Sequence, residues 1–313
     1  MPPKRRKAAD PADAPEAKKR VTRSSTKART SDQDVAKPEP TKPARKASKA
    51  TKPSPSKVNK AKAKVSAPKA EDEPSEETNS PTTFTISHDS VKNPITCHQY
   101  TPESDEDANT PKIIFTHGAR GTLSAPAVVN FCTGYSKGAP VLAFQGSMNL
   151  KARAKGFHAC ISHLETTDPK PDTQVLGGRS MGARAAVIAA TEHLSSSPTS
   201  SSDLKLVLVS YPLKGPKDDI RDQILLDLPS SVGVLFIIGD KDAMCPLDLL
   251  NKTRKKMAAK SQLVVVKGAD HGMHVKGKDR EKKLGEESGM RASDWVSGRL
   301  DQEVLEIKDS ELD

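Results

Sequence analysis

The first 80 residues lack the side chains from which a hydrophobic core is built. They contain no Leu, Ile, Phe, Tyr or Trp and only four Val, while Lys, Ala, Pro, Ser and Thr dominate. Such a segment buries too little apolar surface to offset the entropy that is lost on ordering. The sequence therefore predicts a disordered basic tail over residues 1–80. Residues 81–313 are long enough for one sizeable folded domain.

Long apolar runs and paired cysteines are also missing. No apolar run approaches the roughly 18 residues that a membrane span requires, so no membrane partner is expected. The basic N-terminus has no apolar region of the kind found in signal peptides. The four cysteines form no C-x-x-C pair, which favours buried thiols in a reducing compartment. Because no cysteine or histidine cluster stands out, we expect neither a metal nor an organic cofactor.

Positive charge is concentrated in the tail. Residues 1–70 carry 21 Lys and Arg against six Asp and Glu, a formal charge of +15. This leaves 29 basic and 34 acidic residues, or −5, for residues 71–313. Ten of the cations lie between Lys42 and Lys69, with no aromatic side chain to stack on bases. The pattern predicts non-specific contact with DNA or chromatin through phosphates, which weakens as salt rises.

Two basic clusters near the N-terminus have the spacing of a bipartite nuclear import signal, with ten residues between them. We therefore expect a nuclear protein. A solvated charge run, which would leave the chain in the cytoplasm as well, is the alternative. The clusters consist of Lys4, Arg5, Arg6 and Lys7, and of Lys18, Lys19 and Arg20.

From Thr82 onward, short apolar runs alternate with helical patterns. The first two runs join without a helix and predict an antiparallel hairpin. The later runs are apolar on consecutive residues, as strands covered on both faces require. This predicts an α/β fold with a mostly parallel, eight-stranded, doubly wound sheet. The expected strands are 83–88, 95–101, 112–118, 140–146, 173–178, 204–211, 232–239 and 262–268, and the expected helices are 124–136, 149–165, 181–194, 245–259 and 292–308.

The sequence GGRSMG falls between an expected strand and the helix that follows it. Gly178 and Gly182 stand two positions to either side of Ser180. Small residues there let the strand and the helix approach, while the serine is held in a strained turn. The pattern predicts a nucleophilic serine at Ser180, with an ordinary glycine-rich turn as the alternative.

Two later strands end in the polar loops IIGDKD and GADHG. Open α/β sheets build their sites at the carboxyl ends of strands. We expect His271 to take the proton of the Ser180 hydroxyl, since a hydroxyl alone is a poor nucleophile. Asp242 is expected to orient the imidazole, and Asp240 is the competing carboxylate.

The loop after the third expected strand, in IIFTHGARG, is placed to hold developing negative charge. We expect the backbone amides of Ala119 and Met181 to form an oxyanion hole. Met181 also stands at a helix N-terminus, whose dipole favours an anion. Arg179 and Arg184 bracket the serine, and either attract an acidic substrate or partner or form surface ion pairs.

The combination of THGARG, GGRSMGAR, YPL, GDKDAMCP and GADHGMH resembles an α/β-hydrolase of the dienelactone-hydrolase-like branch, over about residues 110–275. It is most similar to the group that contains testis-expressed protein thirty and the third subunit of the non-specific lethal (NSL) histone acetyltransferase complex. The resemblance implies an α/β-hydrolase fold and a serine hydrolase acting on an unknown ester, thioester or amide. A non-catalytic nuclear scaffold that binds proteins in a chromatin or histone acetyltransferase context is the alternative. The family usually has glycine where Arg120 stands, so a side chain here is expected to crowd the oxyanion pocket.

The sequence predicts no large lid, and it predicts a flexible surface loop over residues 195–202. Hydrolases often insert a lid where residues 212–231 lie, but about twenty residues cannot build a large one. The charged segment 276–289 is expected to be a flexible surface loop.

Overall fold

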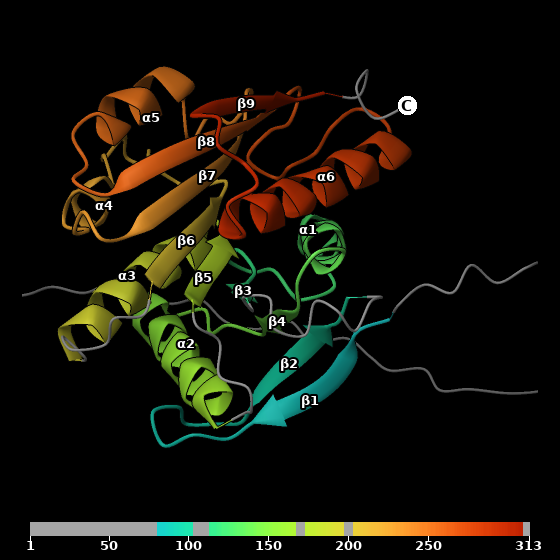
Figure 1. Cartoon of the computed structure of the whole chain (residues 1–313), viewed down its shortest axis with the longest axis vertical. Coiled ribbons are helices and arrows are strands. Elements are labelled where there is room, and N and C mark those ends of the chain that lie inside the picture. Colours follow the sequence, from blue (N-terminus) through green and yellow to red (C-terminus); the bar gives the residue numbers. More distant parts are fainter. Residues whose placement is uncertain (1–79, 103–112, 167–172, 197–202, 309–313) are drawn as a thin grey trace, which may run out of the picture. The chain divides into compact units, whose positions relative to one another are not determined.

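The computed structural model describes residues 80–102, 113–166, 173–196 and 203–308, and in this part of the chain helices cover both faces of one sheet (Figure 1). The predicted tail lies outside the described residues except for Ser80, and so do both basic clusters. Its charge, its import signal and the division of the chain near residue 80 therefore stay predictions. Of the helices in the described part, none combines the length and the apolar character that a bilayer crossing needs.

The sheet begins with the predicted antiparallel hairpin. Strand β1 (Thr82–Ile86) pairs with β2 (Ile95–Tyr100), and β2 pairs antiparallel with β4 (Val141–Phe144). From β3 (Ile113–Thr116) and β4 onward, each neighbouring pair is parallel. The strand order is β1-β2-β4-β3-β5-β6-β7-β8-β9, which confirms the mostly parallel, doubly wound sheet. The remaining strands are β5 (Thr173–Arg179), β6 (Asp203–Val209), β7 (Gly233–Gly239), β8 (Lys260–Val266) and β9 (Val304–Ile307).

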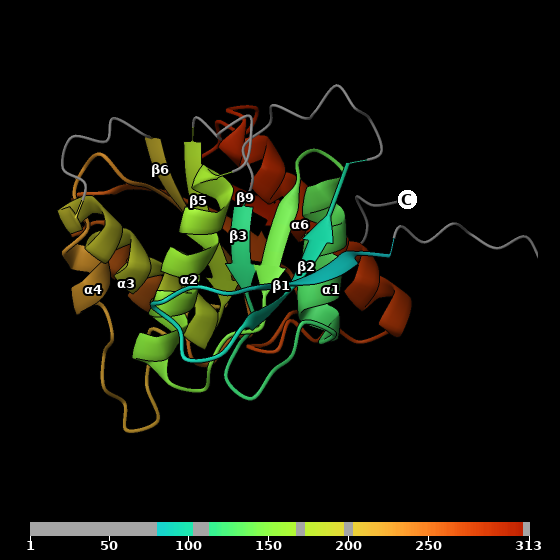
Figure 2. The same cartoon turned by 90° about the horizontal axis from the view of Figure 1, so that it is seen from below.

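The helices divide between the two faces of the sheet, as Figure 2 shows. Neighbouring strand residues such as Ile113 and Ile114 point to opposite faces and are both fully buried, one in each of two hydrophobic clusters. This is why the strands are apolar on consecutive residues. One cluster lies under α1 (Pro126–Ser136) and α6 (Lys278–Val296), and the other under α2 (Leu150–Glu165), α3 (Met181–Ser196), α4 (Gln223–Leu226) and α5 (Leu247–Arg254).

The structure corrects the C-terminal part of the prediction. The segment expected as a loop, 276–289, forms most of α6, and the expected helix 292–308 is replaced by the end of α6 and by β9. Strand β9 adds a ninth, parallel strand beside β8, where eight strands were expected. Helix α6 lies so close to α1 that a Cβ atom on Gly289 would overlap the carbonyl oxygen of Phe131. Its contact surface is therefore made of small residues, which do not produce an apolar pattern.

Residues 212–231 contain an isolated bridge between Lys214 and Ile220 and the single-turn helix α4. No large lid is formed by this segment, as expected. Most of the loop predicted over residues 195–202 lies outside the described residues. All four cysteines are buried free thiols, which confirms that prediction as well.

Candidate active site

A sharp turn joins β5 to α3 at Ser180. The φ angle of Ser180 is +52°, in the left-handed region that is costly for a residue with a side chain. The flanking glycines permit this turn. A Cβ atom on Gly178 would lie 2.5 Å from the backbone carbon of Gly182, and one on Gly182 would lie 2.6 Å from the carbonyl oxygen of Thr116. The predicted strained turn, with small residues on both sides, is thus present.

Ser180, His271 and Asp242 come together from the loops that follow β5, β8 and β7. The Oγ atom of Ser180 lies 2.9 Å from Nε2 of His271. On the other side of the ring, Nδ1 lies 3.0 and 2.9 Å from the two carboxylate oxygens of Asp242. The Asp242 side chain has no exposed surface, and its Oδ1 also accepts a hydrogen bond from the Met244 amide at 2.8 Å. With its Nδ1–H donated to Asp242, the imidazole keeps Nε2 free to accept the serine proton.

Asp240, the competing carboxylate, is bonded elsewhere. Its Oδ1 accepts from the Gly268 amide at 2.6 Å, and its Oδ2 lies 3.0 Å from Nζ of Lys267. Burial alone would raise the pKa of Asp240, but the hydrogen bonds from Lys267 and Gly268 outweigh it and hold that pKa below its usual value. Asp240 therefore braces the ends of β7 and β8, whereas Asp242 contacts the histidine.

The loop after β3 lies directly against the serine. A Cβ atom on Gly118 would be 3.4 Å from Cβ of Ser180. Ala119 follows Gly118 in this loop, and Met181 is the first residue of α3, where amides have no acceptor within the helix. The two amides predicted to hold an oxyanion are thus carried by the two segments that meet at the serine.

Arg120 adopts the backbone conformation that favours glycine, with φ at +55°. Its amide donates to the sulfur of Met148 at 3.2 Å, and its side chain is exposed. Arg120 therefore adopts, with some backbone strain, the conformation of the glycine that the family usually has at this position. Its side chain is turned to solvent.

Arg179 contacts the histidine loop. Its Nη2 donates to the carbonyl oxygen of His271 at 2.7 Å. Burial lowers the pKa of Arg179, and the nearby carboxylates of Asp242 and Asp270 partly oppose this shift. Within the described residues, neither Arg179 nor Arg184 forms an ion pair. The ion pairs considered as one interpretation are therefore not seen in this part of the chain.

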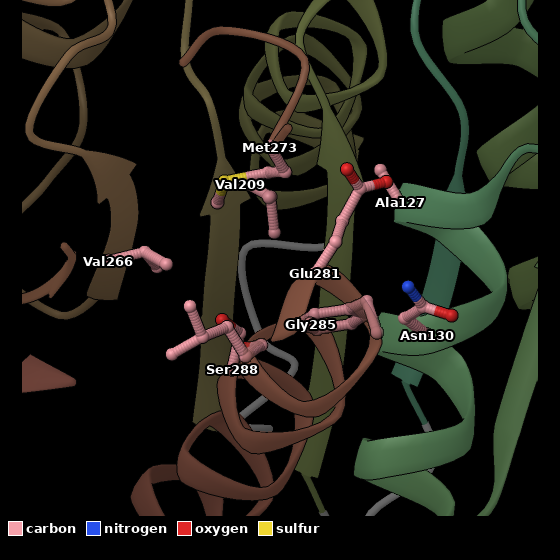
Figure 3. Close-up of a pocket in the computed structure, with 10 residues that line it drawn as sticks. Ala127, Asn130, Val209, Val266, Met273, Glu281, Gly285 and Ser288 are labelled. Atoms are coloured by element: carbon pink, nitrogen blue, oxygen red, sulfur yellow. The ribbon is translucent and has the colours of Figure 1, made fainter. Parts of the chain in front are cut away.

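A narrow cavity lies beside the site, between α1, α6 and the sheet (Figure 3). Val209, whose carbonyl accepts from the Ser180 amide at 2.9 Å, forms part of its wall, as does Met273, two residues after His271. The cavity is small, with room for about one water molecule. The other lining residues are Ala127, Asn130, Phe131, Val266, Glu281, Leu284, Gly285 and Ser288. Neither Ser180, His271 and Asp242 nor the loop after β3 lines this cavity.

Two side chains that the sequence did not predict as part of the site, His117 and Gln145, hold the loop after β3. His117 is buried, and its Nε2 accepts hydrogen bonds from the Gly146 amide at 3.0 Å and from Nε2 of Gln145 at 2.7 Å. The Gln145 Oε1 in turn accepts from the Leu123 amide at 3.2 Å. The signal for His117 was available, since it directly precedes Gly118 in the quoted motif. Across the described residues, no group of His, Cys, Asp and Glu is arranged to hold a metal ion.

The comparisons with known proteins agree with this geometry. A family described as "Alpha/beta hydrolase domain" matches residues 109–294, more than half of the chain. The protein belongs to this family, as the fold and the serine turn indicate. The narrower resemblance, to the dienelactone-hydrolase-like branch and to the group of testis-expressed protein thirty and the NSL subunit, stays a prediction.

Solved structures share the fold at low sequence identity. Est1E from Butyrivibrio proteoclasticus has a TM-score of 0.54 at 15% identity, over 69% of this chain and 99% of its own. An alpha-beta serine hydrolase homologue from Coxiella burnetii has a TM-score of 0.53 at 17% identity, over 67% of this chain and 96% of its own. The match covers nearly all of each neighbour and about two thirds of this chain.

Proposed function

We propose that this protein is a serine hydrolase that cleaves an ester, thioester or amide, with Ser180 as nucleophile, His271 as general base and Asp242 as the orienting carboxylate. One observation carries the proposal. At a strained turn, the hydroxyl of Ser180 is 2.9 Å from His271, whose other nitrogen is 2.9 Å from a buried carboxylate. Such a chain of contacts activates a serine and has no purpose in a turn that only reverses the chain.

In the proposed reaction, Oγ of Ser180 forms a bond to the acyl carbon while its proton passes to Nε2 of His271. The carbonyl electron pair moves onto oxygen, which the amides of Ala119 and Met181 stabilise. The tetrahedral species then collapses, the bond to the leaving group breaks, and the leaving group takes the proton from His271. Water then attacks the acyl carbon of the acyl-serine and gives one proton to Nε2 of His271. The bond between the acyl carbon and Oγ of Ser180 breaks, and Oγ takes this proton back from His271. Asp242 stabilises the imidazolium in both halves of the reaction.

The site also suggests a size for the acyl group. Residues 212–231 contain an isolated bridge and a single-turn helix and build no large lid. Ala119 and Arg120, in the loop that lies against the serine, are exposed. We therefore propose a short acyl group, or one that remains at the surface of the enzyme.

Hydrolysis is favoured over a non-catalytic scaffold for a physical reason. A protein-binding platform needs neither a serine in a left-handed conformation nor a fully buried carboxylate aimed at a histidine, and both are costly to maintain. We further propose that residues 1–70 direct the protein to the nucleus and bind DNA or chromatin without sequence preference. Binding to a larger protein complex is compatible with either activity.

Labelling with a fluorophosphonate probe tests the hydrolase. Wild-type protein should be labelled once per chain, and Ser180→Ala should not be labelled. Ser124→Ala, which removes an exposed serine near the same edge of the sheet, is the matched control and should label like wild type. Equal labelling of wild type and Ser180→Ala, or no labelling and no ester turnover by wild type, would exclude the proposed function.

A further inference from the structure

Arg153, near the start of α2, is a fully buried cation. It forms no ion pair within the described residues. The side chain lies on the buried side of α2, the side that also carries Phe157 and Leu164. Burial lowers the pKa of Arg153 to about 10, so the guanidinium stays protonated at neutral pH. Because an unpaired buried charge is costly, packing alone does not account for an arginine at this position.

Within the described residues, the side chain of Arg153 donates to backbone carbonyl groups of two loops, those that follow β3 and β4. The contacts are Nε with Ser147 at 2.8 Å, Nη1 with His117 and with Gly118 at 3.2 Å, and Nη2 with Gly146 at 3.3 Å. One guanidinium thus ties both loops together. The loop after β3 is the one that carries Ala119, next to the serine.

His117 completes this arrangement as a neutral histidine. Since Nε2 accepts from the Gly146 amide, the ring proton is on Nδ1, which donates to the carbonyl oxygen of Gly118 at 2.7 Å. Burial lowers the pKa of His117, which keeps the ring neutral. The Gly118 carbonyl therefore accepts from three donors: His117 Nδ1, Arg153 Nη1 and, within the loop itself, the Gly121 amide at 3.3 Å.

Fixing the Gly118 carbonyl also fixes the amide of Ala119. The two groups belong to one planar trans peptide, in which C=O and N–H point in opposite directions. With the oxygen held by Arg153 and His117 as well as by the Gly121 amide, the Ala119 N–H is turned away from these donors, and the peptide cannot rotate without breaking their hydrogen bonds. A cation on the carbonyl side also polarises the peptide and strengthens its N–H as a donor.

We propose that Arg153 is a positioning residue, which aims the Ala119 amide at the oxyanion through the Gly118 carbonyl. This inference rests on the proposed hydrolase activity and adds a residue to it. Arg153 does not touch the substrate. Its effect falls on the transition state, in which the oxyanion exists, and leaves ground-state binding of the ester unchanged.

The test compares Arg153→Met, Arg153→Lys and a matched control. Arg254 has a side chain that is only 7% exposed, donates to the Ser261 carbonyl at 2.9 Å and lies 3.6 Å from the exposed carboxylate of Glu303, so Arg254→Met removes a largely buried arginine that makes no contact with the loop after β3. Turnover of p-nitrophenyl acetate is normalised to the active sites that fluorophosphonate titrates. We expect Arg153→Met to lower kcat roughly 10²-fold, the order found when one oxyanion donor is lost, with KM nearly unchanged. Arg153→Lys should recover part of kcat, and Arg254→Met should keep the wild-type value.

A second measurement does not depend on turnover. Amide hydrogen exchange in residues 117–121 should be faster in Arg153→Met than in wild type, and unchanged in Arg254→Met. If Arg153→Met is poorly folded, amide hydrogen exchange in residues 117–121 can be compared between Arg153→Lys and wild type instead. An unchanged kcat per active site, a rise in KM alone, or unchanged exchange in this loop would overturn the proposal. A wild-type protein without labelling or turnover would remove the proposed function and this proposal together, whereas an active wild type with an unaffected Arg153→Met would overturn this proposal alone.

Discussion

Replacing Asp242 by asparagine should abolish most of the activity while leaving the fold intact. The carboxylate oxygens lie 3.0 and 2.9 Å from Nδ1 of His271, and Oδ1 also accepts from the Met244 amide at 2.8 Å. Asparagine has nearly the same shape, and its single oxygen can still accept from Met244. Its amide nitrogen then faces Nδ1 of the imidazole.

This substitution changes which ring nitrogen of His271 carries the proton. Because an amide NH₂ donates, it favours the tautomer with Nδ1 unprotonated, and the proton moves to Nε2. A protonated Nε2 cannot accept the proton of Ser180. Loss of the orienting carboxylate in a serine triad costs roughly 10⁴-fold in kcat, or about 5.5 kcal/mol in the activation free energy. We expect a loss of that order for Asp242→Asn.

The assay is ester hydrolysis with Asp240→Asn as the matched control, since it makes the same change two residues away. Asp240 bonds Lys267 and Gly268, so Asp240→Asn should lower thermal stability and leave kcat nearly unchanged. The pKa of Asp240 is held below its usual value. Its stabilisation is therefore present above the pKa of an unfolded aspartate and is lost as the pH falls through the folded-state pKa. The difference in Tm between wild type and Asp240→Asn should shrink on acidification. A larger rate loss in Asp240→Asn than in Asp242→Asn would refute this assignment of the triad carboxylate.

Three other predictions concern the turn, the acyl group and the tail. In Gly182→Ala, the new methyl meets the Thr116 carbonyl at 2.6 Å, so the free energy of unfolding should fall by about 1–3 kcal/mol and labelling of Ser180 should slow; an unchanged Tm in a thermal melt would contradict the close approach. Among p-nitrophenyl esters, kcat/KM should be highest for acetate or butyrate, because residues 212–231 build no large lid that would bury a long chain; a maximum at longer chains would contradict the proposed short acyl group. Deletion of residues 1–70 removes a formal +15 and should leave Tm nearly unchanged while abolishing salt-sensitive binding to duplex DNA in a gel-shift assay. Salt-resistant binding by residues 71–313 would instead place a nucleic-acid site on the folded domain.

The parts of the site that the sequence predicted are those set by local geometry. Gly178 and Gly182 mark a turn in which a strand and a helix meet, and no other residue fits there. The polar loops that hold Asp242 and His271 follow buried strands directly, so the parallel sheet brings them to one edge. The sequence favoured Asp242 over Asp240 as the orienting carboxylate, but it could not give the physical reason, because both stand in the same turn. The reason is that Lys267 and the Gly268 amide both bind the carboxylate of Asp240, which leaves Asp242 to contact the histidine.

The predicted secondary structure is wrong in the C-terminal part of the chain, where two helices pack through glycine and serine. The sequence predicts a loop for residues 276–289, most of α6, because the face of this helix near α1 is formed by residues such as Gly285, Ser288 and Gly289. Small residues permit the close approach of two helices but carry no hydrophobic periodicity. Strand β9 was not predicted because it carries few buried apolar residues: Val304 and Glu306 are exposed at the edge of the sheet, and only Ile307 is buried.

The buried charge of Arg153 shows why the donors of an oxyanion hole are easier to predict than the groups that aim them. Ala119 and Met181 follow from two short motifs, because each lies beside the residue that defines its motif. Arg153 lies more than thirty residues from the loop it holds, on a helix with no motif of its own. Its one signal is a cation on the buried side of an amphipathic helix, where an apolar residue is expected. A charged residue at a buried position is informative because burying the charge costs free energy. The hydrogen bonds from Arg153 to the carbonyl groups of His117 and Gly118 show that this side chain holds the loop after β3.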